Sequence, residues 1–405
     1  MRFESYLAYR IINKDRDNFS RPIIRISITA IALGVSIMLV SIAIVTGFQQ
    51  TVSQKITGFT SHIRVVNFHN NKSWEISPVE KNQDFYPHLQ DDENIEHIQI
   101  FGLKAGVMKH EGQIMGSVLK GISDDYNWEF MEKNLIKGER IHLYDSSRSN
   151  DIIISRYHAN KLKLDTGQSV LMHFIQDPPR YRKFNVAGIY SSGIEEMDKR
   201  FVLCDLRHIQ RLNDWSENEV AGFEIFLKDM NDLDEYTNKI YETTGFDLKV
   251  ENIRSLHPQI MDWLDMLNTN VIIIIILMVL VSAITMVSTL LILILEKTNM
   301  IGILKALGSK NKSIRKVFIY NALYIVGKGL LWGNIIGLGL LFIQKSTGLI
   351  TLDETTYYMA YVPVNFNLAH ILLVNAGTVM ICFLFMILPS YLVSRINPVD
   401  AIQFD

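Results

Sequence analysis

Apolar residues along the chain gather in four long blocks, and the segments between the blocks have the mixed polarity of water-soluble protein. A helix rises about 1.5 Å per residue, and the hydrocarbon core of a bilayer is about 30 Å thick. Each block is therefore long enough to cross a membrane, and the pattern predicts an integral membrane α-helical protein with four transmembrane helices. The blocks are Ile26–Phe48, Val271–Leu295, Val317–Gln344 and Leu368–Val393.

The four blocks differ in how continuous they are. The second holds 25 consecutive residues without a charge, which is typical of a transmembrane helix. The third contains Lys328, and the fourth contains His370 and Pro389, so these two are less clearly transmembrane. A buried helix in a soluble core is the alternative for the blocks, and it has more weight for the fourth than for the second. The first block is longer than the apolar part of a usual signal peptide and has no small-x-small site, so we expect no cleavage there.

The long interval between the first and second blocks predicts a separate folded domain. Residues 49–268 have an ordinary globular composition and are numerous enough to bury a core of their own. Strand-like runs alternate with helix-like runs at Arg156–Leu164 and Leu206–Leu212. We therefore expect a large extracytoplasmic α+β domain between helices 1 and 2, in one lobe or two. The strand-like runs are HIRVVNF, DIIIS, QSVLMHF, KFNVAGIY, RFVLC and GFEIFL. The flanking segments Gln49–Gly58 and Pro258–Asn268 are expected to prolong the neighbouring transmembrane helices as a stalk.

Charge predicts which side of the membrane each segment faces. Residues 1–25 carry six Lys or Arg against three acids, and residues 296–316 carry six against one. Because basic loops stay in the cytoplasm, we expect both segments there, with the N- and C-termini cytoplasmic and the large domain outside. The expected order is a cytoplasmic segment (1–25), helix 1 (26–48), the external domain with its stalk ends (49–268), helix 2 (269–295), a cytoplasmic loop (296–316), helix 3 (317–344), an external loop (345–367), helix 4 (368–393) and a cytoplasmic tail (394–405).

The first residues form a further pattern. Phe3, Tyr6, Leu7, Arg10 and Ile11 recur at helical spacing, which is typical of an amphipathic helix at the inner surface of the membrane. A frayed cytosolic tail is the alternative.

Composition excludes several classes of function. The net charge is −2, and neither a basic domain nor zinc-finger spacing indicates nucleic-acid binding. Cys204 and Cys382 are the two cysteines, too few for a disulfide framework or a cysteine metal site. Neither HExxH nor GxSxG occurs, and neither does the phosphate-binding G-x-x-x-x-G-K-[ST]. We therefore expect no enzyme site, no metal and no cofactor bound by this chain.

The basic loop after the second block contains a short amphipathic pattern. Met300, Ile303 and Leu307 share one helical face, and Gly308 suits the position just after a helix, where a left-handed conformation is common. Lysine and arginine side chains surround this face. A groove on a partner protein and an anionic lipid surface are equally compatible with this pattern.

This loop and the layout of the chain resemble those of a known family. The string EKTNMIGILKALGSKNKSIRKVFI is similar to the loop after the second span of the FtsX-like permeases of ABC transporters, which include the MacB type. The layout of one span, a large external domain and three more spans matches as well. The ending PSYLVSRINPVDAIQFD, with Pro389, Pro398 and Ala401, resembles the family ending. The resemblance implies a coupling helix held by a cytoplasmic ATPase, formed by Glu296, Lys297, Met300, Ile301, Gly302, Ile303, Leu304, Lys305, Leu307 and Gly308.

Within that group the chain looks most like the lipoprotein-releasing permeases of the LolC and LolE type. The similar segments include ALGVSIMLVSIAIVTGFQQTVSQKITGFTSHI, DIIISRYHANKLKLDTGQSVLMH, KFNVAGIYSSGIEEMDKRFVLC and YYMAYVPVNFN, while residues 70–145 are the least similar. The resemblance implies a permease of the bacterial inner membrane that extracts lipoproteins by mechanotransmission. It implies a separate LolD-like ATPase that binds ATP and Mg, a second permease protomer (identical or paralogous), a lipoprotein substrate, a periplasmic carrier and membrane lipids as partners.

Two further groups of residues are candidates for contacts. Asp177, Pro178, Pro179, Arg180, Tyr181 and Arg182 join two strand-like runs, where the family has a hook that captures the carrier. The segment is shorter here, so a plain hairpin turn is an equal alternative.

Gly329, Gly333 and Gly337 form a row of small residues that suits close helix packing, within one protomer or between two. In the same block Lys328 and Asn334 are expected to face protein or water, or Lys328 to reach the membrane surface.

Other functions remain open at this stage. MacB-like efflux of peptides or drugs is one alternative, although such proteins usually carry a fused ATPase. An FtsX-like regulator that signals to an external hydrolase is another, and it would predict a smaller external domain. Co-purification with an ATPase would support all three transporter-like functions and would exclude a membrane enzyme.

Overall fold

The computed structural model describes residues 3–13, 20–70, 74, 76–144 and 147–392. These residues form two compact units, which are described separately below. One comprises Met1–Gln49, Trp263–Thr351 and Tyr361–Asp405, and the other Gln50–Asp262 and Leu352–Ala360. The expected tail 394–405, with Pro398 and Ala401, lies outside the described residues, as do Arg2, Lys14 and Arg16.

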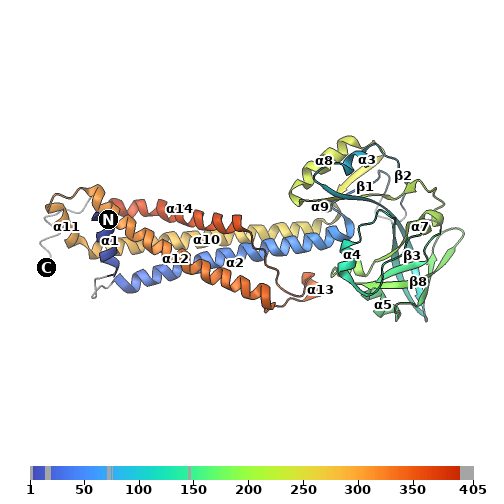
Figure 1. Ribbon diagram of the computed structural model, residues 1–405, viewed down its shortest axis with the longest axis horizontal. Coiled ribbons are helices and arrows are strands. Elements are labelled where there is room, and N and C mark those ends of the chain that lie inside the picture. The colour runs from blue at the N-terminus through green and yellow to red at the C-terminus, as the bar shows by residue number, and fades with distance from the viewer. Residues whose placement is uncertain (1–2, 14–19, 71–73, 75, 145–146, 393–405) are drawn as a thin grey trace. The chain divides into compact units, whose positions relative to one another are not determined.

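Four long apolar helices dominate the first unit (Figure 1). They are α2 (Ser20–Thr60), α10 (Pro258–Glu296), α12 (Asn311–Thr347) and α14 (Leu368–Leu392). Each is long and apolar enough to cross a membrane, which confirms the four predicted transmembrane helices. Both expected stalk segments are helical, because α2 continues to Thr60 and α10 begins at Pro258.

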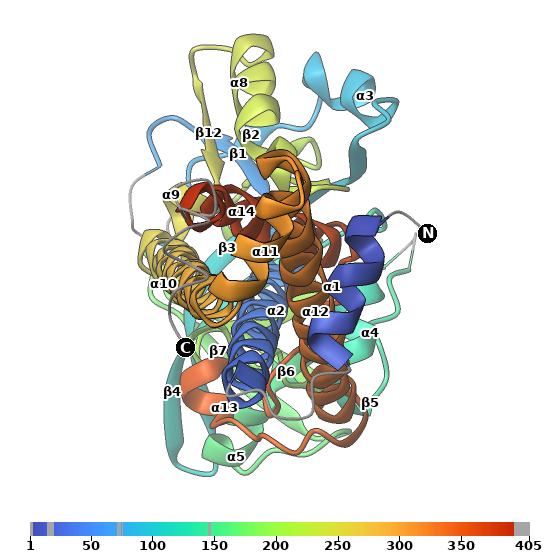
Figure 2. The same ribbon diagram turned by 90° about the vertical axis from the view of Figure 1, so that its left-hand side faces the viewer.

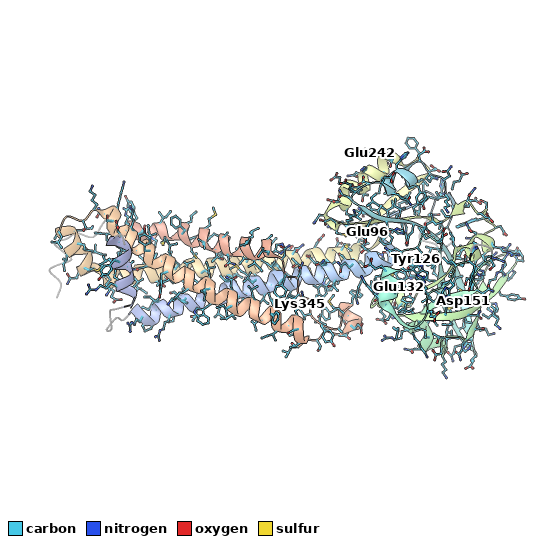
Figure 3. The ribbon with its side chains drawn as sticks, viewed as in Figure 1. Glu96, Tyr126, Glu132, Asp151, Glu242 and Lys345 are labelled. Atoms are coloured by element: carbon cyan, nitrogen blue, oxygen red, sulfur yellow. The ribbon has the colours of Figure 1, made fainter. Side chains whose placement is uncertain are left out.

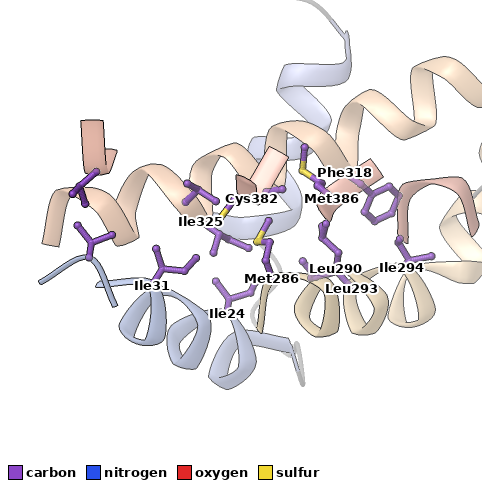
Figure 4. Close-up of a cluster of buried hydrophobic side chains, with 14 of the residues drawn as sticks. Ile24, Ile31, Met286, Leu290, Leu293, Ile294, Phe318, Ile325, Cys382 and Met386 are labelled. Carbon is purple, nitrogen blue, oxygen red and sulfur yellow. The ribbon is translucent and has the colours of Figure 1, made fainter. Parts of the chain in front are cut away.

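An apolar core joins the four helices. Buried side chains from each of them meet with Ile301 of α11 (Thr298–Ala306). Figure 2 shows the helices, and Figure 4 shows side chains of this cluster. Ile31 and Leu290 are both completely buried in it. The outer surface is apolar as well, since residues such as Ile276 and Ile284 of α10 are more than half exposed. A helix that is apolar all round in this way is expected in lipid.

The N-terminal segment forms the helix α1 (Phe3–Asn13). Ala8 and Ile11 are buried against Val317 of α12, with Leu7 packed beside them. The alternative of a frayed tail is therefore wrong, because the apolar face of α1 finds a protein partner. Arg10 remains exposed.

The second unit is an α+β domain, as predicted. Its main sheet has ten strands in the order β12-β1-β11-β3-β4-β9-β6-β8-β5, with β7 pairing with β3 and β8. Its strands are β1 (Ile63–Asn67), β3 (Ile95–His110), β4 (Gln113–Ile122), β5 (Leu135–Gly138), β6 (Asp151–Ser155), β7 (Ser169–Phe174), β8 (Arg180–Tyr190), β9 (Phe201–Asp205), β11 (Gly222–Leu227) and β12 (Leu248–Asn252), and β2 (Val79–Glu80) and β10 (Glu219–Val220) form a separate pair.

The long strand β3 divides this domain into two lobes. Its first half pairs with β11, and its second half pairs with β4 from Gly102 onward. In the second lobe β3, β4, β9, β6, β8 and β7 each pair with the next, and β7 pairs back with β3, so the six strands close into a barrel. Alternate side chains fill the interior, among them Leu119, Met172 and Phe184.

Short helices complete the domain. Figure 3 shows the side chains and labels Glu96, Tyr126, Glu132, Asp151 and Glu242 on this unit and Lys345 on α12. The helices are α3 (Phe85–Gln90), α4 (Glu129–Asn134), α5 (Arg156–Leu162), α6 (Glu195–Asp198), α7 (Leu206–Leu212), the 3₁₀ turn η1 (Met230–Asp232), α8 (Leu233–Thr243), α9 (Ile253–Leu256) and α13 (Glu354–Tyr357).

The loop between α12 and α14 contributes to the same unit. Residues Leu352–Ala360 cluster with Gln50–Asp262. The Lys55 Nζ donates a hydrogen bond to the carbonyl of Tyr358 at 2.6 Å. This loop therefore contacts the same end of α2 as the large domain does.

Candidate functional site

The candidate coupling helix is α11, which lies between α10 and α12 in the sequence. Ile301 and Gly302 are buried, and Leu304 is packed against the apolar core of the first unit. Ile303 is 48% exposed and Leu307 is 79% exposed. The helix is thus held by one face and presents two aliphatic side chains on the other.

The structure corrects the face that spacing alone predicted. Met300 was expected beside Ile303 and Leu307, but it packs with Leu7 against the cluster of Ala8, Ile11 and Val317. A contact with α1, distant in the sequence, therefore partly buries Met300.

The end of α11 has the predicted cap. Gly308 has φ +88°, in the left-handed region that favours glycine. The Gly308 amide donates to the carbonyl of Lys305, and the Ser309 amide donates to the carbonyl of Leu304 at 2.9 Å. These two bonds form a Schellman motif, which ends the helix and leaves Leu307 exposed in its last turn.

Basic side chains surround the exposed part of α11. Lys310, Lys312 and Lys316 are exposed nearby, and burial together with the charge of Arg315 lowers the pKa of Lys305. At the start of the segment Lys297 lies 3.4 Å from Glu296. The surface is an aliphatic pair within a positive field, which suits an acidic rim around an apolar groove.

The candidate docking loop is the turn of a β-hairpin. Strands β7 and β8 pair antiparallel from Phe174 opposite Arg180, and Asp177, Pro178 and Pro179 lie exposed in the turn. Ile175 is 81% exposed and Tyr181 is 65% exposed. The turn and the start of β8 therefore carry two exposed apolar side chains.

Arginine side chains cluster beside this hairpin. The Arg180 Nη2 contacts Asp214 at 2.7 Å, and the Arg207 Nη2 contacts Asp205 at 2.6 Å, so these two are neutralised. Burial lowers the pKa of Arg182, and the charges of Arg211 and Arg148 lower it further.

An open cavity of 730 Å³ lies at this cluster, lined by Arg148, Arg207 and Arg211 together with Trp215. Arg148 Nη1 is buried and has no hydrogen-bond partner among the described residues. The sequence did not single out Arg148, Arg207 or Arg211, because they lie in segments that meet only once the barrel is closed.

The glycine row on α12 faces α2 of the same chain. A Cβ on Gly329 would lie 2.6 Å from Ile31, and one on Gly333 would lie 2.8 Å from the Ala32 carbonyl oxygen. A Cβ on Gly337 would lie 3.1 Å from the Ser36 Cα. The row therefore allows the backbones of α2 and α12 to approach each other closely.

Two polar side chains of α12 are also accounted for. Asn334 hydrogen-bonds Asn375 of α14, so it faces protein. Lys328 is exposed, and its ammonium lies 4.6 Å from the centre of the Tyr324 ring. Within the described part of the chain, no group of three His, Cys, Asp or Glu side chains could hold a metal ion.

Comparisons with known proteins match both units. Residues 26–242 match the MacB-like periplasmic core domain, and residues 272–398 match the FtsX-like permease C-terminal region. The lipoprotein-releasing system transmembrane protein LolC of Xylella fastidiosa is 22% identical, over 97% of this chain and 96% of its own length. LolE of Haemophilus influenzae is 19% identical over 96% of both chains. The crystal structure of the periplasmic region of MacB from Actinobacillus actinomycetemcomitans matches with a TM-score of 0.33 and 13% identity, over 49% of this chain and 92% of that one.

Proposed function

The chain belongs to the FtsX-like ABC transporter permeases with a MacB-like periplasmic core domain, and from this we propose that it extracts lipoproteins from the inner membrane and passes them to a periplasmic carrier. The observation that carries this proposal is the similarity to proteins named LolC and LolE over nearly the full length of both partners. A relative matched over both the external domain and all four spans shares the whole apparatus, whereas a single shared domain would support only a shared fold.

The energy comes from a separate LolD-like ATPase that binds ATP and Mg. This chain has no G-x-x-x-x-G-K-[ST] segment to hold a nucleotide. Its contact with the ATPase is α11, where Ile303 and Leu307 enter a groove and the surrounding lysines pair with an acidic rim. Because Ile301 is buried in the core of the first unit and Leu304 packs against that core, a push on α11 moves the helices to which it is packed.

The orientation follows from the charged loops. The N-terminus, α11 and the C-terminal tail are cytoplasmic, and residues 49–268 are periplasmic. The contact between Lys55 and Tyr358 supports this orientation, because it places the loop after α12 on the side of the large domain.

Substrate passes between two protomers, identical or paralogous. The exposed aliphatic side chains of α10, such as Ile276 and Ile284, supply the apolar surface that acyl chains and the second protomer require. Each CH₂ group withdrawn from the membrane costs about 0.8 kcal/mol, so release of a multiply acylated protein requires an energy source such as ATP.

The carrier docks at the β7–β8 hairpin. Ile175 and Tyr181 offer apolar contacts, and the arginines beside them offer charge to an acidic partner surface. Arg182→Glu should weaken carrier binding at least tenfold, since reversal of a charge in a complementary interface commonly costs more than about 1.4 kcal/mol. Lys228→Glu is the matched control, because this exposed lysine follows β11 in the other lobe of the domain, away from the hairpin. Equal effects of the two substitutions on carrier affinity would argue against this site.

The experiment that tests the function is release of a labelled lipoprotein from proteoliposomes. They contain this chain, its second protomer and the ATPase, with ATP enclosed in the vesicle lumen and carrier added outside, so that ATP reaches the cytoplasmic face and carrier reaches the external domain. We expect lipoprotein to appear in the soluble carrier fraction only when ATP and carrier are both present. Export of a soluble peptide while lipoproteins stay in the membrane would show a MacB-like efflux permease instead. ATPase association without transport of either would show a signalling regulator.

A further inference from the structure

The C-terminal end of α2 is fixed inside the external domain by a buried ion pair. The Lys120 Nζ on β4 donates a hydrogen bond to the carbonyl of Phe59 at 2.6 Å. The same ammonium lies 2.8 Å from Glu224 Oε1 on β11. The Lys120 side chain is 3% exposed, and that of Glu224 is completely buried. One lysine therefore joins the last turn of α2 to both strands.

The carboxylate of Glu224 is held from its other side as well. The Gln99 Nε2 on β3 donates to Glu224 Oε2 at 2.8 Å, and the Asn127 amide fixes Gln99 by donating to its Oε1 at 2.9 Å. Arg64 approaches Glu224 Oε1 at 3.5 Å. Burial alone would raise the pKa of Glu224, but Lys120 and Arg64 reverse that effect and lower it. The carboxylate is thus ionised and tightly held.

The helix end completes the electrostatic balance of this cluster. Two cations, Lys120 and Arg64, face one carboxylate. The C-terminus of a helix carries about half a negative charge on its unpaired carbonyls, and the Phe59 carbonyl presents part of it to Lys120. If α2 withdrew, the buried ammonium would lose this acceptor, which is strongly unfavourable.

The cluster also spans the division between the two lobes. Glu224 lies on β11, which pairs with the first half of β3, and Lys120 lies on β4, which pairs with the second half. The Phe59 ring packs 5.3 Å from the Phe201 ring of β9 and 6.0 Å from that of Tyr190 on β8. The end of α2 is therefore bound to both lobes at once.

We propose that Lys120 and Glu224 are positioning residues for transport, forming a latch through which movement of α2 drives both lobes of the external domain. This inference rests on the proposed function, because it assumes that ATP hydrolysis is coupled to release. The helix α2 is continuous from Ser20 to Thr60, so a rotation or shift along it reaches the Phe59 carbonyl without a hinge. With the latch intact, the two lobes follow the helix.

The test uses the full transporter in proteoliposomes and measures lipoprotein released per ATP hydrolysed. In Lys120→Met we expect ATP hydrolysis to continue while this ratio falls roughly tenfold, as for a typical coupling free energy. Lys137→Met is the matched control, since it removes an exposed ion pair with Asp165 in the same domain. We expect the control to keep the wild-type ratio.

A second variant guards against misfolding. Lys120→Met leaves Glu224 with one cation fewer, whereas Lys120→Met combined with Glu224→Gln leaves a neutral amide that still accepts from Gln99. Hydrogen exchange should rise in the last turn of α2, around Thr57 and Ser61, while β4 and β9 stay protected. Lost protection throughout the sheet in both variants would assign the pair a purely structural role and overturn the proposal.

A wild-type ratio in either variant would overturn the proposal as well. If the wild-type transporter releases no lipoprotein, the proposed function is wrong. If the wild-type transporter releases lipoprotein and the latch variants have the same ratio, the proposed function stands and only the latch is wrong.

Discussion

Asn334 of α12 and Asn375 of α14 exchange two hydrogen bonds between their side-chain amides. The Asn334 Nδ2 donates to Asn375 Oδ1 at 2.7 Å, and the Asn375 Nδ2 donates to Asn334 Oδ1 at 3.0 Å. Each Nδ2 also donates to a carbonyl of its own helix. Both amides are therefore fully satisfied in an apolar setting, and they set the register of the two helices.

Replacing one of the two asparagines should lower the free energy of unfolding nearly as much as replacing both. Asn375→Leu leaves the Asn334 amide without its partner, and hydrogen bonds between transmembrane helices contribute about 0.6 kcal/mol on average and at most about 1.7 kcal/mol. We expect a coupling energy in this range from a double-mutant cycle with Asn334→Leu, measured by unfolding in mixed micelles. Strictly additive single effects would show that the two amides do not interact.

The glycine row should tolerate no side chain where it meets α2. In Gly333→Ala the new Cβ would lie 2.8 Å from both the Ala32 carbonyl oxygen and the Val35 Cβ. Because the obstacle includes backbone, we expect a loss of about 1–3 kcal/mol in unfolding free energy. Gly339→Ala is the control, since nothing lies within 4 Å of its Cβ. It should be neutral or stabilise the helix by up to about 1 kcal/mol. Similar losses in both variants would argue that helix propensity, not packing, governs this face.

A buried histidine should make the external domain sensitive to acid. His158 on α5 is completely buried, and its two ring nitrogens contact the hydroxyls of Ser117 and Ser155 at 2.9 and 2.7 Å. Burial lowers the pKa of His158 from 6.5 to about 4. The neutral imidazole is the folded form, so the unfolded chain takes up a proton first as the pH falls.

The stabilisation from His158 is therefore complete above about pH 6.5 and is lost as the pH falls through about 4. A shift of this size corresponds to about 3 kcal/mol at about 1.4 kcal/mol per unit. His158→Gln keeps polar groups for both serines but cannot titrate. It should therefore make the free energy of unfolding less dependent on pH. Urea-dependent hydrogen exchange of β4 and β6 between pH 7.5 and 4.5 measures it, with exposed His88→Gln as control. An unchanged slope in His158→Gln would exclude this residue as the cause.

The elements that the sequence predicted correctly are those whose surroundings stay the same along their whole length. The four transmembrane helices are apolar on all sides, because lipid or protein surrounds them everywhere, and a long uncharged block reveals them. Strands such as β6 and β11 are short apolar runs with turn residues at their ends, and they too were found.

The longest strand was missed for a physical reason. Over its 16 residues β3 changes neighbours from β11 to β4, and its burial follows no alternation. Gly102 and Gly106 suggest breaks in the sequence. In the structure, a Cβ on Gly102 would lie 2.5 Å from Leu206 of α7. The glycine therefore leaves space for α7 to pack against the strand, and it does not end the strand.

The exposed surfaces at the candidate sites could likewise be predicted only in part. Spacing predicted an exposed face with Ile303 and Leu307 on α11, but Met300 is partly buried against α1, a contact that no local pattern encodes. The turn between β7 and β8 was found from its prolines. Arg148 and Arg211 join it only because β6 and α7 are brought there by barrel closure.

The exposed residues of α11 lead to a separate prediction about the ATPase. Leu307→Asp changes a side chain that is 79% exposed, so the permease should fold normally. A carboxylate at this position would lose the apolar contact and would meet the acidic rim that the surrounding lysines imply. Truncation of a central interface side chain commonly costs about 2 kcal/mol or more, so we expect ATPase affinity to fall at least thirtyfold.

The choice of variants makes this prediction specific. Leu304→Asp is unsuitable, because Leu304 packs against the core of the first unit and its loss would disturb the helix itself. Lys310→Ala lies just beyond the cap, is exposed, and removes one positive charge without touching the aliphatic pair. It should weaken the complex only slightly and in a salt-dependent manner. The measurement is ATPase bound to purified permease at increasing concentration and at two ionic strengths. Normal ATPase binding by Leu307→Asp would contradict the assignment of α11 as the coupling helix, whatever the permease transports.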